Sequence, residues 1–281
     1  MGFSTRPPGA LVLAAAIALA VPAGAASPPA ATPTTPEKRY QACMDTVAAN
    51  APKALDDARA WVKAGGGDAA RHCAAAAEMA LGRFSEAGET LADLARHGGA
   101  EIADNPVLRA SLWGQAAHAF LAADLPAQAE QAAAAGSGLV PRDPGLLVLH
   151  ARALAAQDRY GDAVRDLDRA ISLDPELTEA YVFRGSAQRQ EGALEAAQAD
   201  LDKALTLDPD QPEALLERGI VSRLKGNDAA AAADWRKLIE TAPKSAAAES
   251  ARLNLEKMET DAAKPPQGGQ TKKGEKTGKG G

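Results

Sequence analysis

The sequence predicts an all-α fold built from stacked helical hairpins. Four prolines recur at intervals of 34 residues, at Pro141, Pro175, Pro209 and Pro243. A fixed period of this length is typical of arrays in which each repeat is one helix-turn-helix unit. The composition agrees, because 46% of the 281 residues are hydrophobic but only 4% are aromatic, and alanine supplies much of the apolar content. Runs of β-branched and aromatic residues, which strands favour, are missing.

Small residues recur in the same phase between the prolines. Small side chains where two helices cross let the backbones approach closely, and larger neighbours fill the remaining gaps. In the first helix of each hairpin the small residue is Ala117, Ala151, Gly185 and Gly219. In the second helix the early alanine is Ala129, Ala163, Ala197 and Ala231.

The same period places turns and helix ends. Polar or glycine-containing turns are expected near Asp124, Asp158, Gly192 and Gly226. Each period-34 proline ends its helix, because proline disfavours helical geometry in the residue before it. Pro144 and Pro212 suit the first turn of the next helix, where a missing N–H costs little.

With these positions aligned, residues 144–243 resemble the tetratricopeptide repeat family. The resemblance is weaker over 110–143, where Trp113, Ala117, Phe120, Ala129 and Pro141 match but Gly136 fits poorly. It implies an α-solenoid of antiparallel hairpins in a right-handed superhelix, with the first helix of each hairpin lining a concave face. A further hairpin is expected at 68–97. The competing interpretation is an alanine-rich helical bundle without repeats.

The first residues have the pattern of an export signal. Arg6 precedes an uncharged apolar run over 10–21, which is too short to span a bilayer comfortably. The small residues Ala23 and Ala25 then predict cleavage after Ala25, with Ala26 as the second choice. We therefore expect a periplasmic or secreted protein. The alternative is an uncleaved membrane anchor.

The expected organisation follows from these signals. Regions are a signal peptide (1–25), a Pro/Thr/Ala linker (26–38), an N-terminal helical region (39–109), repeats at about 110–143, 144–177, 178–211 and 212–244, a capping helix (245–261) and a basic Lys/Gly tail (262–281). The cap is predicted from an apolar stripe on Ala248, Ala251, Leu255 and Met258.

The charge is divided unevenly between the folded part of the chain and the basic tail. The formal net charge is −6, which includes Arg6 and a tail of +3, so the folded body carries about −10. Such an acidic body argues against nucleic acid as a partner, because binding phosphates needs a basic face. The tail is expected either to touch an anionic lipid or wall polymer or only to aid solubility.

The chain contains two cysteines, Cys43 and Cys73. Two cysteines in an exported protein tend to pair, and a bridge here would stabilise the part of the chain least like a repeat. Free structural thiols and a zinc site that includes His72 are the alternatives. The zinc site lacks an evident fourth ligand.

Motifs for catalysis or cofactors are absent from the sequence. It contains no paired metal-binding histidines, no nucleophile elbow and no Gly-rich phosphate loop, so we expect a protein that is not an enzyme and binds no cofactor. One charged pattern repeats: Arg184 and Arg218 precede the small glycines, and Asp200 and Asp234 lie on the following helices. This pattern indicates either interhelical salt bridges or a row of arginines for ligand carboxylates.

The family resemblance also locates a partner surface on the first helices. Its rows are Val148, Val182, Leu216; Arg152, Ser186, Ile220; and Ala155, Arg189, Arg223, with Gly114, His118 and Leu121 from the weaker repeat. The mixture suits an extended or helical peptide with apolar anchors and some acidic groups. An ordinary solvated face is the alternative, with Leu216 and Ile220 covered by the terminal helix.

The expected function is therefore a periplasmic scaffold that binds a segment of another envelope protein. Exported relatives imply the alternative of an accessory subunit in cytochrome maturation, secretion, polysaccharide export or wall remodelling. A polymer-binding protein is less well supported, because aromatic residues are scarce on the predicted face. A hydrolase with an unrecognised site lacks any catalytic constellation.

Overall fold

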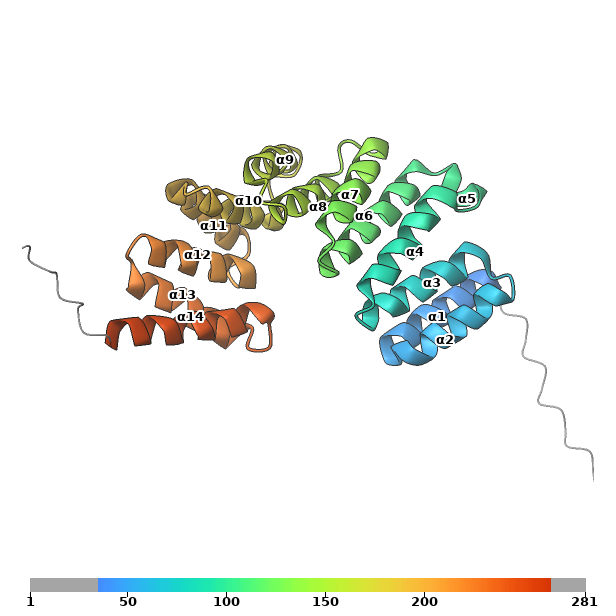
Figure 1. Ribbon diagram of the computed structural model, residues 1–281, viewed down its shortest axis with the longest axis horizontal. Helices are drawn as coiled ribbons and strands as arrows, with labels where there is room; N and C mark the ends of the chain where they lie inside the picture. The colour runs from blue at the N-terminus through green and yellow to red at the C-terminus, as the bar shows by residue number, and fades with distance from the viewer. Residues whose placement is uncertain (1–34, 264–281) are drawn as a thin grey trace, which may run out of the picture. The chain divides into compact units, whose positions relative to one another are not determined.

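The computed structural model describes residues 35–263. The predicted signal peptide, residues 26–34 of the linker and the tail beyond Ala263 lie outside this range. Within it the chain forms helices and no strand (Figure 1). The helices are α1 (Pro36–Ala49), α2 (Ala51–Lys63), α3 (Gly67–Ala80), α4 (Phe84–His97), α5 (Ala100–Ala103), α6 (Pro106–Ala122), α7 (Pro126–Leu139), α8 (Pro144–Ala155), α9 (Tyr160–Leu173), α10 (Thr178–Gln190), α11 (Leu194–Leu207), α12 (Pro212–Leu224), α13 (Asp228–Thr241) and α14 (Ala246–Ala263).

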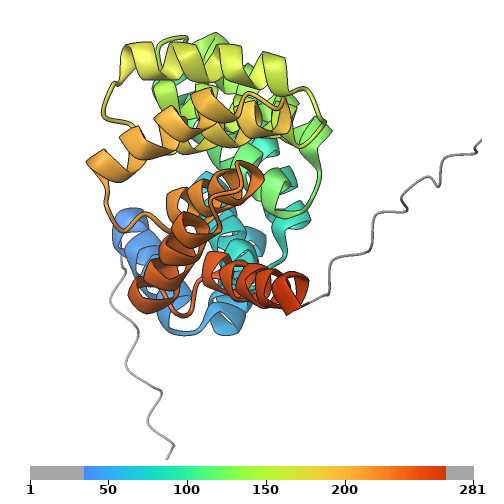
Figure 2. The same cartoon turned by 90° about the vertical axis from the view of Figure 1, so that its left-hand side faces the viewer.

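From α6 to α14 the helices pack in chain order, each on the next. The cartoons show the same succession, from green α6 to red α14 (Figures 1 and 2). Alternate helices α6, α8, α10 and α12 also contact one another, and α12 contacts α14. No comparably extensive contact joins α7, α9, α11 and α13 within this part of the chain. The first helices of the hairpins therefore form one shared surface, which we call the inner face.

Each hairpin ends as its proline predicts. The helices α7, α9, α11 and α13 stop two residues before the period-34 prolines. The intervening residues Val140, Asp174, Asp208 and Ala242 all have φ near −130° and positive ψ. Pro144 and Pro212 occupy the first position of α8 and α12, where proline costs little.

The turns inside the hairpins share one backbone conformation. Asp124, Asp158, Gly192 and Gly226 all have positive φ, between 57° and 80°. These are the positions where the sequence predicts reversals, and they too lie 34 residues apart. A left-handed residue after a helix lets the chain turn sharply into the next one.

The predicted small residues lie at the helix crossings. Ala151, Ala163, Ala197 and Ala231 are fully buried. A Cβ atom added to Gly185 would meet Leu201, and one added to Gly219 would come within 2.3 Å of Trp235 Nε1. The close approach of first and second helices therefore depends on the absence of a side chain at these two glycines.

The repeating charges are interhelical salt bridges. Arg184 of α10 binds both carboxylate oxygens of Asp200 on α11, at 2.6 and 2.7 Å. It also donates to Asp168 on α9, in the preceding repeat, at 2.6 Å. Arg218 repeats this arrangement with Asp234 and Asp202. Each arginine thus joins three helices, and the interpretation as a row of ligand-binding arginines is wrong.

The N-terminal helices depart from the period. The disulfide between Cys43 and Cys73 joins α1 to α3, as predicted, beside the buried Trp61 of α2. Two boundaries differ from expectation. Helix α1 begins at Pro36, inside the predicted linker, because proline suits a first helical turn. Helix α6 begins at Pro106, before the expected Ala110, because Asn105 caps it by accepting the N–H of Leu108.

Candidate functional site

The candidate site is a groove along the inner face, made of four adjacent hollows. Their volumes are about 560, 120, 340 and 170 Å³, in order from α1 to α10. Neighbouring hollows share a wall residue: Gln115 joins the first two, His118 the second and third, and Arg152 the third and fourth. We call this series of adjoining hollows the inner groove.

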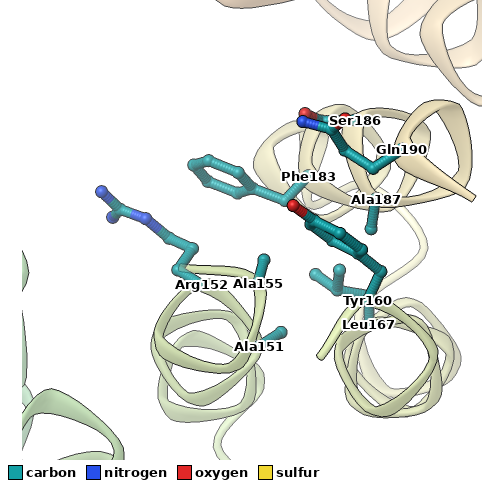
Figure 3. A pocket seen from close by; sticks show the side chains of 9 residues that line it. All are labelled: Ala151, Arg152, Ala155, Tyr160, Leu167, Phe183, Ser186, Ala187 and Gln190. Atoms are coloured by element: carbon teal, nitrogen blue, oxygen red, sulfur yellow. The ribbon is translucent and has the colours of Figure 1, made fainter. Parts of the chain in front are cut away.

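Arg152 lies at the centre of the inner groove. Figure 3 shows its side chain beside Phe183, with Ala155 of α8 and Ser186 of α10 lining the same hollow. The guanidinium carbon lies 4.8 Å from the centre of the Phe183 ring. This distance permits a cation–π interaction, which leaves the N–H donors unused.

The side chain of Arg152 makes no hydrogen bond or ion pair with any residue between Thr35 and Ala263. Burial lowers the pKa of Arg152, while the charges of Glu179 and Glu213 act in the opposite direction. An arginine stays protonated in proteins, so this site holds a charged, half-buried group whose donors lack acceptors among the described residues.

The other arginines of the predicted face are already paired. Arg189 of α10 contacts Glu217 of α12 at 2.7 Å. Arg223 contacts Asp228 at 3.4 Å and Asp261 of α14 at 3.0 Å. These pairs fix neighbouring helices. They leave Arg152 as the strongest candidate among these three for a partner contact.

The apolar residues of the predicted face are less exposed than expected. Val148 and Val182 are each only 2% exposed, so the expected row of exposed side chains is wrong, although Val148 lines the third hollow. Both valines belong instead to clusters of buried side chains that link neighbouring hairpins. Leu216 and Ile220 are half-buried in the cluster that includes Ala248 and Met258 of α14, as the alternative interpretation holds. His118 and Ser186 do line the groove.

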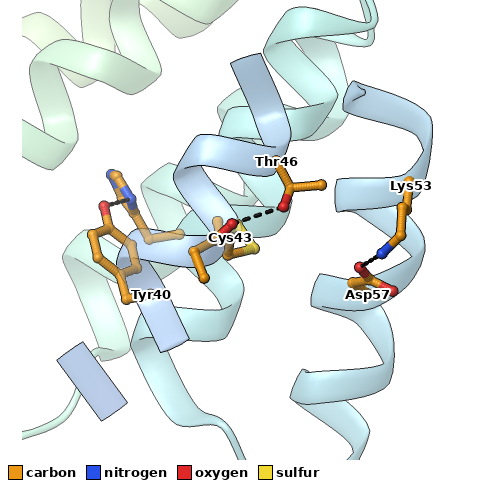
Figure 4. Close-up of a disulfide and its surroundings, with 8 residues drawn as sticks. Tyr40, Cys43, Thr46, Lys53 and Asp57 are labelled. Carbon is orange, nitrogen blue, oxygen red and sulfur yellow. Dashed lines mark hydrogen bonds and ion pairs between the residues drawn. A yellow bond between two sulfur atoms is a disulfide. The ribbon is translucent and has the colours of Figure 1, made fainter. Parts of the chain in front are cut away.

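Sequence reasoning missed the N-terminal end of the groove. Tyr40 Oη lies 2.8 Å from His72 Nδ1, and His72 Nε2 lies 3.0 Å from Gln115 Oε1. These hydrogen bonds link α1, α3 and α6. Figure 4 shows Tyr40 on the same helix as the disulfide-bonded Cys43. The position of His72 next to Cys73 is the only sequence signal for this residue. That signal indicates a metal ligand, whereas the structure places His72 in the wall of the groove.

Comparison with known proteins identifies the repeats. Residues 148–212 and 194–246 match the tetratricopeptide repeat family model. Residues 148–246 are thus similar to tetratricopeptide repeats. No curated protein matches the chain.

Several solved structures are similar in fold to this chain. A tetratricopeptide repeat protein of Thermus thermophilus is 20% identical, with a TM-score of 0.57 over 69% of this chain and 99% of that one. MamA is 18% identical, with a TM-score of 0.48 over 60% and 95%. The first tetratricopeptide domain of Spaghetti (RPAP3), solved with an HSP90 peptide, is 25% identical, with a TM-score of 0.40 over 42% and 93%. The Thermus structure confirms the helical solenoid fold.

The inner groove presents apolar and hydrogen-bonding groups. Among the residues that the structure describes, no three histidine, cysteine, aspartate or glutamate side chains gather to hold a metal ion. None of the helices described is long and apolar enough to cross a membrane. What the groove does offer is apolar hollows, one unpaired guanidinium and several neutral hydrogen-bonding groups.

Proposed function

We propose that this protein is a non-enzymatic scaffold that binds an extended or helical segment of another protein in the inner groove. The succession of adjoining hollows supports this proposal best. Three shared wall residues connect four hollows across α1 to α10, a length suited to a peptide and not to one small molecule. Apolar side chains of the partner would fill successive hollows.

Arg152 gives the groove a point of specificity. Its guanidinium presents several N–H donors in a fixed plane, which match the two oxygens of a carboxylate. Phe183 holds the guanidinium from one side, so little side-chain freedom remains to be lost on binding. We therefore propose that the partner segment places an Asp, a Glu or a terminal carboxylate against Arg152.

We also propose that the protein works in the periplasm, on a partner in the cell envelope. Two features support this location. Residues 1–25 have the order of charge, apolar run and small residues of an export signal. The Cys43–Cys73 disulfide suits an oxidising compartment. A fusion of residues 1–40 to alkaline phosphatase, which is active only after export, tests the location; an inactive, full-length fusion would contradict it.

Site-specific photocrosslinking in the source cells tests the binding function. A photoreactive amino acid is placed at Ser186 in the inner groove and, as a control, at the exposed Lys203 of α11. We expect a discrete protein adduct from Ser186 and none from Lys203. Adding Arg152→Ala should reduce the Ser186 adduct at least tenfold, whereas the exposed Arg236→Ala should leave it unchanged. Equal adducts from both positions would contradict a groove-bound partner.

A further inference from the structure

The largest hollow of the groove is a pocket in its own right. It occupies about 560 Å³ between α1, α3, α5 and α6, within the size range of ligand sites. Its apolar floor is the partly buried Leu108 of α6, backed by the buried Ile102 of α5, Leu112 of α6 and Leu94 of α4. We call it the terminal pocket. A side chain of the size of leucine fits such a lining and would be removed from water there.

The charged groups that line the terminal pocket are all acidic. They are Glu37, Asp68 and Glu101, and no lysine or arginine is among the lining residues. Asp68 accepts the N–H of Gly99 at 2.6 Å and lies 3.6 Å from Arg71, outside the pocket. Exposed Glu101 has neither a hydrogen bond nor an ion pair to any residue between 35 and 263. The rim thus carries carboxylates and no lysine or arginine beside an apolar floor.

The remaining polar wall is neutral and fixed in place. Tyr40, His72 and Gln115 are joined by hydrogen bonds of 2.8 and 3.0 Å across three helices. Burial raises the pKa of Tyr40, so its phenol keeps its proton and stays a hydrogen-bonding group. A wall held by such a network needs little rearrangement when a ligand enters.

We infer that the terminal pocket takes a lysine or arginine together with a neighbouring apolar side chain of the partner segment. This inference rests on the proposed function and gives the groove a direction. The basic part of the segment lies toward α1, and its carboxylate lies toward Arg152 on α8. Opposite charges along one groove fix the register of a bound peptide, because reversal places like charges together.

The chain's own neighbouring sequence is a poor occupant. Residues 26–34 contain no charged side chain, so they lack the cation that the rim would attract. Residues 264–281 contain five lysines but no large apolar side chain for the floor. Residues 1–25 do combine Arg6 with large apolar side chains, but the proposed export would remove them. In the exported protein the combination that the pocket favours therefore comes from a partner.

The disulfide supports one wall of the terminal pocket. Helix α1 supplies Tyr40 and Gln41, and the Cys43–Cys73 bond fastens this helix to α3. Reduction would leave α1 held by noncovalent packing alone. The affinity of the pocket should therefore fall when the bond is reduced, even if α3 to α6 stay folded.

Fluorescence anisotropy with defined peptides tests the inference on the full chain. The probe is a fluorescein-labelled octapeptide of alternating leucine and lysine, and its matched controls alternate leucine with glutamate and serine with lysine. We expect the leucine–lysine probe to bind at least tenfold more tightly than either control. Equal binding of the serine–lysine peptide would reduce the site to general charge attraction and overturn the inference.

Variants then locate the binding. Glu101→Gln should weaken the leucine–lysine probe about threefold, and adding Asp68→Asn about tenfold in total, while the exposed Glu89→Gln on α4 leaves it unchanged. Reductant should weaken the probe further. No effect of Glu101→Gln and Asp68→Asn together would overturn the inference. So would binding that appears only after residues 1–34 are removed, because the chain itself would then fill the pocket.

Failure of this inference is distinguishable from failure of the proposed function. If Arg152→Ala abolishes the Ser186 adduct while the terminal-pocket variants leave probe and adduct unchanged, only the inference fails. If the probe responds to Glu101→Gln but no adduct forms at Ser186, the groove-wide scaffold fails and the pocket binds by itself.

Discussion

At the residue scale, one backbone conformation marks every regular repeat. Asp124, Asp158, Gly192 and Gly226 all adopt positive φ in the turn between two helices. Glycine enters this region without steric cost, whereas a residue with a Cβ atom loses about 1 kcal/mol there. The array therefore carries mild strain in its first two turns and none in the last two.

Substitution of Gly226 by alanine tests this conformational requirement. Gly226 has φ of 80° and open space around it, so only backbone strain opposes a methyl group. We expect Gly226→Ala to lower the free energy of unfolding by about 1 kcal/mol in a urea titration. Gly138→Ala on α7 is the control. It lies in a helix, also with open space, and should raise stability by about 0.5–1 kcal/mol.

The sequence predicts the solvent exposure of individual side chains less well than it predicts the helices. The period correctly assigns Val148 and Val182 to first helices, but both valines are buried instead of accessible. Phase within one helix does not reveal how closely the next first helix approaches. That approach depends on side chains 34 residues away, so burial on the inner face follows from stacking between repeats and not from any single hairpin.

At the element scale, Gly219 on α12 faces Trp235 of α13 with no room for a side chain. A Cβ atom there would lie 2.3 Å from Trp235 Nε1, and the Trp235 indole is itself held by a hydrogen bond to the carbonyl of Leu216 at 3.2 Å. The ring is 1% exposed, so it has no open path for retreat. The spacing of α12 and α13 is thus set by one missing methyl group.

Gly219→Ala should therefore destabilise the protein although alanine favours helices. We expect a loss of roughly 2 kcal/mol in chemical denaturation, because overpacking outweighs the gain of about 1 kcal/mol in helix propensity. Combining it with Trp235→Leu should recover part of the loss, measured as a coupling energy between the two sites. A stabilised Gly219→Ala protein would contradict the close approach.

The Arg184 salt bridge gives a second test at this scale. Hydrogen bonding to Asp200 raises the pKa of Arg184, and Asp200 is only 7% exposed. Arg184→Ala would leave that carboxylate buried without its partner, so we expect a loss of roughly 2–3 kcal/mol in thermal or urea unfolding. Arg184→Met with Asp200→Leu should lose much less. The exposed pair of Arg252 and Glu249 is the control and should contribute under about 1 kcal/mol.

At the scale of the whole molecule, the core is a series of clusters instead of one centre. Four groups of buried side chains follow one another along the chain, and each draws on neighbouring hairpins. Stability in such an array is approximately a sum of local terms and nearest-neighbour contacts. A change at one end is therefore felt mainly at that end.

Reduction of the disulfide tests this locality. The bond closes a loop with a sequence separation of 30. Its loss should cost roughly 3–4 kcal/mol by the chain-entropy estimate. Hydrogen exchange should accelerate in α1 to α3 and stay unchanged in α12 to α14. Uniform acceleration along the chain would show a single cooperative unit and contradict the serial core.

The regular part of the molecule could be predicted because its information is local and repeated. Prolines, small crossing residues and turns recur in register, so each hairpin supports the assignment of the next. The terminal pocket could not be predicted in this way. It combines the short helix α5, which interrupts the period, with side chains such as Tyr40, His72 and Gln115 that are far apart in sequence.

The interhelical salt bridges of Arg184 and Arg218 also affect how such a chain can evolve. Arg218 finds Asp202 at the spacing at which Arg184 finds Asp168. Deleting residues 178–211 would therefore place Arg218 opposite Asp168, with its own Asp234 still beside it. Gene rearrangements that remove or duplicate this 34-residue unit preserve these arginine–aspartate pairings at the new junction. The length of the array is thus free to drift between lineages, while its two differently built ends are not.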